Sequence, residues 1–469
     1  MPSHRTGPSG APPGRNTVRS NVKRISGLAV IAALTLAACG GDDGGSTTTE
    51  APSTEAPSTE APSTEAPAAE GWTADTSACV DPDAATAPIE GTIKIGSAMP
   101  LSGGIAATAF APVKDGYEAY IQYANENKLL GDVTIEVQIE DDQYNKDLTP
   151  TAVEKLLDDG ANLFSAIIGT PNNIAVRDLL NEECYPQLLA LSGSPAFGQA
   201  ADYPWTTGLL VSYVAEAKAY AALIAERFPD GAKVAVFTVN NEFGQVYAEA
   251  FKEVAPDFNI TIVDEQTIEA TDNAPPVAQV NSIASNAPDA VLAVPLGAGC
   301  ASFLSEVANA KAANAGWAPE LYLTSTCSSS LILSIAGPAA DGLFTSTNLV
   351  DLNDPETQKE PAVAEYIAYM TDLGKADIIP TAGAGWHAAE MTVKILQQAQ
   401  ASASGLTRAS IIEAARNFDQ AGSLNRPGIT LKMSGLEDPY MAESMQVVQY
   451  DADTMRFTDI GDLITQFES

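Results

Sequence analysis

Small, hydroxyl-bearing and amide residues gather in five short loops of this chain, and each loop follows a run of β-prone apolar residues. The loops span residues 99–104, 169–173, 192–197, 295–300 and 325–329. Each leads into a predicted helix, whose first backbone N–H groups and dipole favour hydrogen bonding to a polar or anionic group such as a carboxylate. A single loop of this kind could be only a helix cap and a tight turn. Five of them favour a cleft that binds a small polar molecule.

Residue patterns for catalysis are scarce. The chain contains no H-E-x-x-H, no G-x-S-x-G and no phosphate-binding P-loop sequence. His387 is the single histidine of the body, which leaves no His-rich metal site, and we expect no metal and no cofactor. A lone histidine is more often a surface or core residue than a ligand-binding one. Carboxylate pairs such as Asp141 and Asp142 leave a hydrolase open as an alternative.

Two series of strands and helices must position these loops. Strands are predicted at 92–96, 133–139, 164–168 and 187–191, and again at 233–239, 260–263, 290–294 and 321–324. Among the helices between them, one is predicted to have Thr149 as N-cap, Pro150 at its first position and Gly160 at its end. This alternation predicts α/β lobes with parallel sheets, in which ligands bind beyond the carboxyl ends of the strands.

The first 90 residues predict export and anchoring. A basic stretch without acids precedes an apolar run at 25–36, which is too short to span a bilayer and fits a signal peptide over 1–38. The run ends in Leu-Ala-Ala-Cys-Gly, which resembles a bacterial lipobox with Cys39 as the lipidated residue. Repeats of Ala-Pro-Ser-Thr-Glu follow, so 39–90 is predicted to be a disordered tether. We expect a lipid-anchored protein on the extracytoplasmic face of the cell membrane.

The net charge limits which partners the chain can bind, and the number of cysteines indicates disulfides. The chain has 24 basic and 60 acidic residues and a net charge of -36, which argues against nucleic acid as a partner. Four cysteines follow Cys39, and an even number in an exported protein favours disulfides. Of the three possible connectivities, the strand positions favour Cys79 with Cys184 and Cys300 with Cys327.

Several short motifs carry a family resemblance by their order and spacing. They are Gly-Ser-Ala-Met-Pro-Leu-Ser-Gly at 96–103, Glu-Asp-Asp-Gln at 140–143, Leu-Leu-Asp-Asp-Gly at 156–160, Ile-Gly-Thr-Pro at 168–171, Asn-Asn-Glu-Phe-Gly-Gln at 240–245 and Gly-Ala-Gly-Trp at 383–386. From residue 93 onward the chain is similar to type I periplasmic binding proteins of the leucine/isoleucine/valine-binding family. The resemblance implies two doubly wound parallel-sheet lobes, 91–212 plus 341–430 and 213–340 plus 431–469. A three-crossover hinge would join them near Ser212, Asp341 and Leu431.

The resemblance also implies roles for individual residues. The first-lobe loops would hydrogen-bond the ligand through Ser102, Gly103, Thr170 and Asn172. The loop that usually grips an amino acid's carboxylate and ammonium would be formed by Ser192, Gly193 and Ser194. Phe243 stands where the family usually has a ligand-stacking tyrosine, Gly297 lies in a second-lobe loop, and Trp386 would wall the cleft. Thr326 lies where amino-acid binders carry an acid for the ammonium, and no acid stands between residues 324 and 330.

The function implied is that of a monomeric binding component of an ABC importer, with membrane permease subunits as partners. Its ligand would be a small polar or amphipathic metabolite, such as an amino acid, amide, urea-like compound or carboxylate. Because a buried ammonium without a counter-charge is costly, the missing acid counts against a branched-chain amino acid. A ligand-sensing lipoprotein of the same fold is the alternative, and a secreted hydrolase fits the sequence less well.

Overall fold

The computed structural model describes residues 71–103, 107–272 and 274–465. The predicted signal peptide, Cys39 and the repeats of the tether lie outside these residues. Residues 71–90, also assigned to the tether, are instead folded. They contain helix α1 (Pro82–Thr86), and Trp72 donates its backbone N–H to Asn417 Oδ1 at 2.9 Å. The disulfide of Cys79 and this hydrogen bond hold the segment in place.

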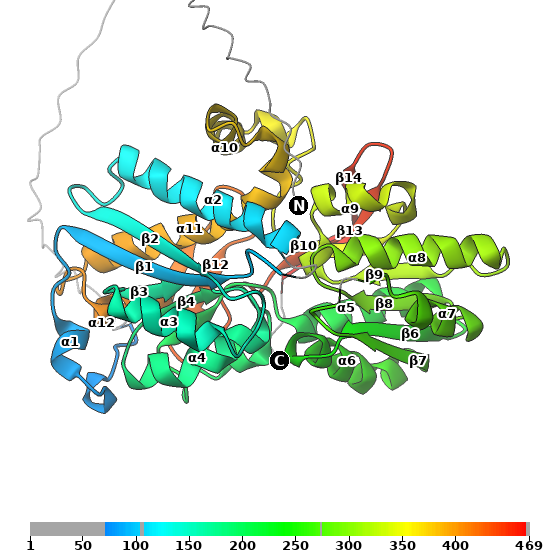
Figure 1. Cartoon of the computed structure of the whole chain (residues 1–469), viewed down its shortest axis with the longest axis horizontal. Coiled ribbons are helices and arrows are strands. Elements are labelled where there is room, and N and C mark those ends of the chain that lie inside the picture. Colours follow the sequence, from blue (N-terminus) through cyan, green and yellow to red (C-terminus); the bar gives the residue numbers. More distant parts are fainter. Residues whose placement is uncertain (1–70, 104–106, 273, 466–469) are drawn as a thin grey trace, which may run out of the picture. The chain divides into compact units, whose positions relative to one another are not determined.

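The first lobe is built on a five-stranded parallel sheet in the order β2-β1-β3-β4-β5. Its helices α2 and α11 pack against each other on one face, while α3 and α4 cover the other (Figure 1). The strands are β1 (Thr92–Met99), β2 (Thr134–Asp141), β3 (Leu163–Ser165), β4 (Gln187–Ala190) and β5 (Thr206–Gly208). The helices are α2 (Ala107–Glu126), α3 (Thr149–Asp158), α4 (Thr170–Glu182), α10 (Pro361–Asp372), α11 (Ile379–Gln400) and α12 (Arg408–Arg416). A two-stranded sheet of β11 (Asn417–Gln420) and β12 (Leu431–Ser434) follows α12.

The second lobe has a seven-stranded sheet in the order β14-β13-β10-β9-β8-β6-β7. The pairs β10–β13 and β13–β14 are antiparallel, and the other pairs are parallel. The strands are β6 (Ala232–Val239), β7 (Ile260–Ile268), β8 (Ala290–Val294), β9 (Glu320–Leu323), β10 (Phe344–Thr347), β13 (Met445–Asp451) and β14 (Arg456–Ile464). The helices are α5 (Tyr213–Arg227), α6 (Glu242–Val254), α7 (Val277–Ser285), α8 (Gly299–Ala313) and α9 (Ser330–Ala336).

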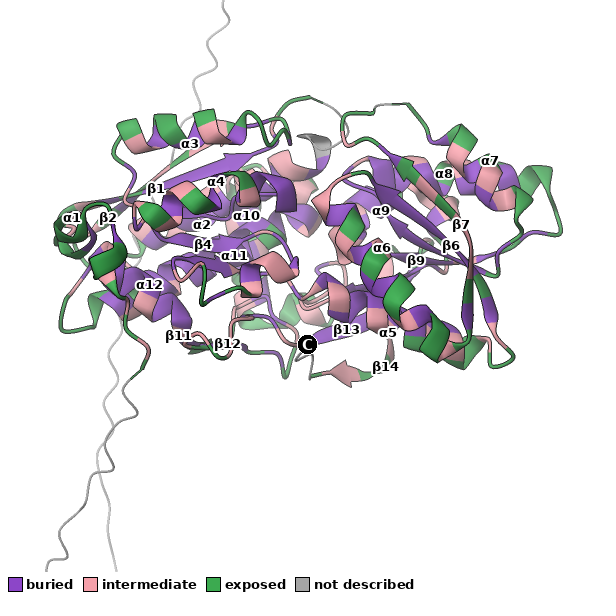
Figure 2. Ribbon diagram, turned by 90° about the horizontal axis from the view of Figure 1, so that it is seen from below, coloured by how far each residue is buried: buried purple, intermediate pink, exposed green. Residues whose placement is uncertain are grey.

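The central strands of both sheets are buried, and the outer faces of the covering helices are exposed (Figure 2). In β8 all five residues are buried, as expected for a central parallel strand with helices on both faces. The predicted α/β fold with two parallel-sheet lobes is therefore confirmed. None of the helices in the described part of the chain is long and apolar enough to span a membrane.

The chain passes between the two sheets three times. The first passage, between β5 and α5, is formed by residues 209–212. The second follows Thr347 and not Asp341, because β10 pairs with β9 and β13 in the second sheet. The third follows Ser434 and not Leu431, because β12 pairs with β11. Isolated bridges join Gly208, at the end of β5, to Tyr440 of the third passage, and Leu349 of the second passage to Asn425, in the loop between β11 and β12.

Two local expectations can be compared with the structure. Thr149 does not cap α3: Leu148 is the N-cap, and the Thr149 hydroxyl donates to Asp142 Oδ2 at 3.0 Å. The predicted disulfide pairing is confirmed, with Cα atoms 5.5 Å apart for Cys79–Cys184 and 5.9 Å apart for Cys300–Cys327. The second disulfide joins the start of α8 to the turn after β9, and so braces two of the polar loops.

Candidate functional site

A cavity of about 220 Å³ lies between the two lobes, with walls from both lobes and from the first two connecting segments. It is smaller than the roughly 300–1,000 Å³ usual for pockets that hold drug-sized ligands. This volume suits a metabolite. The first two connecting segments contribute Leu209, Val211, Leu349 and Leu352, among others, and β13 contributes its first residue, Met445, so most of the surface near the hinge is apolar.

The first-lobe wall is built by α2 and α11. Pro380, Gly383, Ala384 and His387 recur on α11 at the spacing of one helix face, and all of them line the cavity. From α2 come Ala109, Phe110 and Val113. Beside them lies Tyr144, whose ring stacks on Phe110 with centroids 6.5 Å apart. The polar groups on this wall are the His387 imidazole and the hydroxyls of Tyr144 and Thr381, and the rest of it is apolar.

The second-lobe wall is rich in hydroxyls. The turn after β9 and the start of α9 contribute Ser325, Thr326, Ser328, Ser329 and Ser330, and the end of β10 adds Ser346 and Thr347. Phe243 and Leu296 supply apolar surface. Small residues after parallel strands leave room at the sheet edge, and their hydroxyls can donate to or accept from a ligand.

Behind this wall lies Glu216, a buried carboxylate in the first turn of α5. It accepts from Tyr220 Oη at 2.6 Å, from Ser325 N at 2.7 Å and Ser325 Oγ at 3.1 Å, from Ser346 Oγ at 2.8 Å, and from the Tyr247 hydroxyl. Burial raises the pKa of Glu216, against the opposing effect of these donors. Glu216 therefore fixes two residues of the cavity wall, Ser325 and Ser346, without lining the cavity itself.

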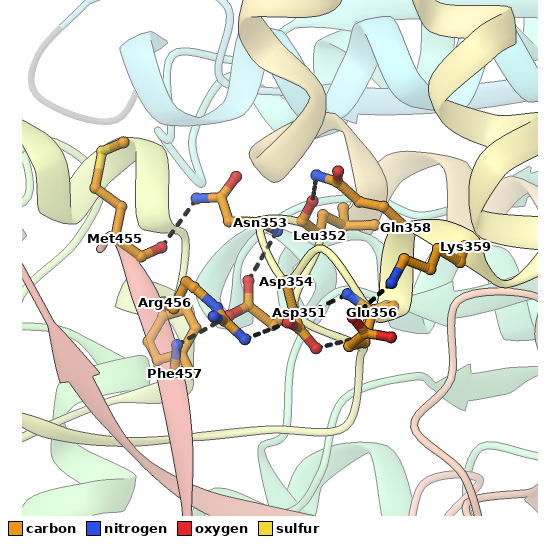
Figure 3. A network of polar contacts seen from close by, with 11 residues as sticks. Asp351, Leu352, Asn353, Asp354, Glu356, Gln358, Lys359, Met455, Arg456 and Phe457 are labelled. Carbon is orange, nitrogen blue, oxygen red and sulfur yellow. Dashed lines mark hydrogen bonds and ion pairs between the residues drawn. The ribbon is translucent and has the colours of Figure 1, made fainter.

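Among the residues that the structure describes, Asp351 is the one carboxylate that lines the cavity, and both of its oxygens accept a hydrogen bond. Oδ1 accepts from Asn353 N and Oδ2 from Phe457 N, each at 2.9 Å. The adjacent Asp354 pairs with Arg456, so this network ties the second connecting segment to β14 (Figure 3). Burial raises the pKa of the Asp351 carboxyl. No lysine or arginine of the described residues lines the cavity.

The two lobes also touch directly beside the cavity. Lys146, in the loop after β2, forms an ion pair at 2.6 Å with Glu242 in the first turn of α6. Ser329 Oγ of the second lobe lies 2.6 Å from Thr381 Oγ1 of α11. The structure therefore has the lobes closed on each other.

Two of the residues expected at the site, Phe243 and Thr326, line the cavity from the second lobe. Gly297 lies next to the lining residue Leu296, and its φ of +55° allows the tight turn there. His387 also lines the cavity, although the sequence gave little reason to expect it there.

Other residues expected at the site do not line the cavity and contact other protein groups. Ser102 and Gly103 are exposed, and Ser102 N donates to Asp141 Oδ1 at 3.1 Å. Asn172 is buried and donates from Nδ2 to Asp142 Oδ2 at 2.8 Å. Trp386 does not open a helix at the cleft mouth: α11 begins at Ile379, and the indole packs edge-on against Tyr120, with centroids 4.9 Å apart.

The residues of the loop after β4 are placed apart from the main cavity. Thr170 Oγ1 lies 2.7 Å from Ser192 Oγ, and both residues are buried. Ser192, Gly193 and Ser194 line a separate void of about 10 Å³, which is at most the size of one water molecule. A Cβ on Gly193 would lie 2.0 Å from Val211 O, so the glycine lets this loop approach the first connecting segment closely.

The buried histidine predicts a specific pH dependence of stability. Burial lowers the pKa of His387 to about 4 from an ordinary value of 6.5, against Glu390, which raises it, while Lys394 lowers it further. The unfolded chain therefore binds a proton near pH 6.5 that the folded chain does not bind until about pH 4. The resulting stability is fully present above pH 6.5 and is lost as the pH falls toward 4.

We expect the wild type to lose about 2–3 kcal/mol more unfolding free energy than His387→Gln between pH 7 and pH 4.5, on the scale of 1.36 kcal/mol per pKa unit. Urea unfolding of both proteins at the two pH values measures the difference. Equal losses in the two proteins would show that His387 is not kept neutral by burial.

The described residues contain no group of three or more histidine, cysteine, aspartate or glutamate side chains placed to hold a metal ion. What the site offers is an apolar chamber with hydroxyls on one wall and an imidazole on the other. Such a chamber can bind and enclose a molecule through shape and hydrogen bonds.

The fold is shared with several solved solute-binding proteins. A branched-chain amino acid ABC transporter protein from Thermus thermophilus with bound valine has a TM-score of 0.71 and 19% identity, covering 80% of this chain and 97% of its own. A fatty acid ABC transporter substrate-binding protein from Thermomonospora curvata has a TM-score of 0.66 and 17% identity, covering 81% and 94%. A solute-binding protein from R. palustris in complex with benzoate has a TM-score of 0.66 and 19% identity, covering 79% and 96%.

None of the curated proteins compared with this chain is significantly similar to it in sequence. The model of the periplasmic binding protein family, in contrast, matches residues 92–454, which include both sheets and nearly every residue that lines the cavity. The chain, whose two lobes close over an interlobe cavity, is therefore a member of the periplasmic binding protein family.

Proposed function

We propose that the chain is the extracytoplasmic solute-binding lipoprotein of an ABC importer, and that it holds one small, largely apolar molecule between its lobes. The observation that carries this proposal is the interlobe cavity of about 220 Å³, to which both lobes contribute walls. A ligand that touches both lobes binds the closed form more tightly than the open form, and so shifts the population toward closure. The permease would then recognise the closed form.

The chemistry of the cavity favours an amphipathic ligand with an apolar skeleton. The structurally similar proteins include ones with valine and benzoate bound and one described as a fatty acid binder, all of them small molecules with an apolar part. An α-amino acid fits this cavity less well. Thr326 lies in the loop where amino-acid binders of the family carry an acid for the ammonium, and the Asp351 carboxylate already accepts two backbone N–H groups.

A thermal-shift screen of the purified protein tests the proposal. The panel should include branched-chain amino acids, fatty acids, aromatic acids and uncharged aromatic or alicyclic compounds. A ligand present at 100 times its dissociation constant stabilises the folded state by about 2.7 kcal/mol, which shifts the melting temperature measurably. Loss of uptake of that ligand when the gene is deleted would support import. No shift with any compound, or turnover of one of them, would contradict the proposal.

Phe243→Leu is expected to weaken binding of the ligand found in this screen by roughly 0.5–1.5 kcal/mol. The phenyl ring lines the cavity, and the variant loses the contacts that the ring would make with the ligand. Its ring also packs against Tyr213, with centroids 5.3 Å apart, so some stability is lost as well. Isothermal titration calorimetry measures the affinity.

The matched control for this change is Phe237→Leu. Phe237 is buried in the same lobe against Phe303, with centroids 4.6 Å apart, and does not line the cavity. We expect it to lower stability but to leave affinity unchanged. If both variants weaken binding equally, Phe243 acts through the fold and not through ligand contact.

A further inference from the structure

The disulfide between Cys300 and Cys327 lies next to the second-lobe wall of the cavity. Both cysteines are fully buried, and their Cα atoms are 5.9 Å apart. Cys300 is in the first turn of α8, and Cys327 ends the short 3-10 turn Ser325–Cys327 after β9. Neither cysteine lines the cavity, but the two sequence neighbours of Cys327, Thr326 and Ser328, both do. The disulfide is therefore one residue away from the surface that a ligand would meet.

The loop between β8 and α8 depends on local hydrogen bonds. Residues 295–299 read Pro-Leu-Gly-Ala-Gly, and Leu296 lines the cavity. Gly299 N donates to Leu296 O at 2.9 Å, and Cys300 N donates to Gly297 O at 3.1 Å. Two glycines in five residues give this stretch wide conformational freedom. Since β8 and β9 are neighbouring parallel strands (Figure 1), the disulfide ties this loop to the turn that follows the next strand.

The turn after β9 is fixed at two points. Glu216 accepts hydrogen bonds from Ser325 N at 2.7 Å and Ser325 Oγ at 3.1 Å, and the disulfide holds Cys327 two residues further on. Thr326 lies between these points, half-buried and on the cavity wall. Its own contacts are weak, because its N and Oγ1 each lie 3.4 Å from Thr324 Oγ1, at the long limit of a hydrogen bond. The residues on either side therefore set the position of Thr326.

We propose that Cys300 and Cys327 are positioning residues of the binding site, whose disulfide sets the places of Leu296 and Thr326 on the cavity wall. Ligand affinity, and not only stability, then depends on this disulfide. A wall that is rigid before the ligand arrives loses less conformational entropy on binding, so it binds more tightly than a mobile wall. This inference rests on the proposed solute-binding function and adds a requirement of the same site.

The disulfide of the first lobe, Cys79–Cys184, is a matched control. Its cysteines are also buried, and neither they nor their sequence neighbours line the cavity. It spans 105 residues of sequence, whereas the second-lobe disulfide spans 27. Because a disulfide stabilises mainly by restricting the unfolded chain, the longer loop should contribute more to stability. The two disulfides should thus differ in opposite directions, one in stability and the other in affinity.

The test compares Cys300→Ala/Cys327→Ala with Cys79→Ala/Cys184→Ala in the full-length protein. Calorimetry uses L-leucine, decanoate, benzoate and cyclohexanol as probes, at a temperature where all proteins are folded. The second-lobe variant should bind the probe that the wild type binds best about tenfold more weakly, because its wall is no longer rigid. The first-lobe variant should keep the affinity of the wild type, although its melting temperature should fall further.

Hydrogen exchange measures the wall without any ligand. In Cys300→Ala/Cys327→Ala the backbone amides of residues 296–299 and 326–329 should exchange several-fold faster than in the wild type, while those of β6 should not change. Cys300→Ala/Cys327→Val fills part of the volume of the lost sulfur atoms without restoring the covalent link. We expect this variant to share the loss of affinity. Wild-type affinity in it would show that packing, and not the disulfide, positions the wall.

Two other results would overturn the positioning role and leave the solute-binding function standing. One is unchanged affinity of Cys300→Ala/Cys327→Ala for a probe that the wild type binds, or unchanged exchange of the two loops. The other is an equal loss of affinity in both disulfide variants, since that loss would reflect general destabilisation. A wild-type protein that binds none of the four probes would give a different pattern, and would count against the solute-binding function together with this inference.

Discussion

Glu216→Ala is expected to lower the free energy of unfolding by about 3–5 kcal/mol, since it leaves several buried donors without an acceptor. These donors are the hydroxyls of Tyr220, Tyr247 and Ser346 and both polar groups of Ser325. Chemical denaturation at pH 7 measures the loss. A loss below about 1 kcal/mol would mean that the donors find other partners easily.

Glu216→Gln is the matched variant and should cost far less. The Tyr220 hydroxyl has a single hydrogen, yet it lies 2.6 Å from Glu216 Oε1 and 2.7 Å from Leu323 O. When one carboxylate oxygen is replaced by an amide nitrogen, the Tyr220 hydroxyl can still donate to Leu323 O. A glutamine amide keeps the shape of the side chain and one acceptor oxygen, so we expect it to keep most of the stability.

Glu216→Ala should also weaken ligand binding. Ser325 and Ser346 line the cavity and are both held by Glu216. Without the carboxylate the hydroxyls of Ser325 and Ser346 lose their acceptor, and the part of the cavity wall that these two residues form loses its fixed geometry. We expect Glu216→Ala to bind the ligand of the wild type about tenfold more weakly, and Glu216→Gln to bind it nearly as well. Unchanged affinity in Glu216→Ala would show that the wall does not depend on this network.

The fold was predictable because its signals are local. Runs such as 233–239 and 290–294 are apolar, rich in β-branched residues and bounded by turn residues, and they became β6 and β8. In contrast, β10 reads Phe-Thr-Ser-Thr, a short polar run whose strand character comes from pairing with β9 and β13. Its place in the second sheet depends on long-range partners that periodicity does not reveal.

The site was predictable only in part. Phe243 and Thr326 lie on the cavity wall, since both follow strands of the second sheet at its carboxyl edge. The polar residues of the first-lobe loops mostly bond one another, as Asn172 does with Asp142 and Thr170 with Ser192. A hydroxyl or amide side chain at the end of a strand can hydrogen-bond a ligand or a neighbouring protein group, and the sequence does not show which of the two it does. Only the packed neighbours decide between them.

Two residues now assigned to the site gave weak sequence signals. Glu216 lies in a helix of ordinary composition, and its burial became visible only when Tyr220, Tyr247 and Ser346 came together from three separate elements. His387 was unusual in the sequence only as the single histidine of the body. His387 follows Gly383 by four residues and Ala384 by three, so all three lie on one face of α11. The sequence did not show that this face lines a cavity.

The second large effect is expected from Gly385→Ala, at the crossing of α11 and α2. A Cβ at Gly385 would lie 1.8 Å from Val113 O, and a Cβ at Gly116 would lie 1.9 Å from Ala382 O. Each helix thus places a backbone carbonyl over a glycine of the other. Because backbone atoms cannot rotate away, the two helices would have to separate, and we expect a loss of about 3 kcal/mol or more of unfolding free energy.

The sign of this result is informative, because an alanine inside a helix normally stabilises it by about 1 kcal/mol relative to glycine. Gly316→Ala, in the turn after α8, is the control for the added methyl group, since its Cβ would meet nothing closer than Asn314 Oδ1 at 3.8 Å and we expect little change in stability. The function should suffer together with the fold, because Phe110 and Val113 of α2 and His387 of α11 line the cavity from these two helices. Separating the helices widens that wall, so affinity should fall even at temperatures where Gly385→Ala remains folded. A stable Gly385→Ala protein with unchanged affinity would show that the first-lobe wall of the cavity does not depend on this close helix crossing.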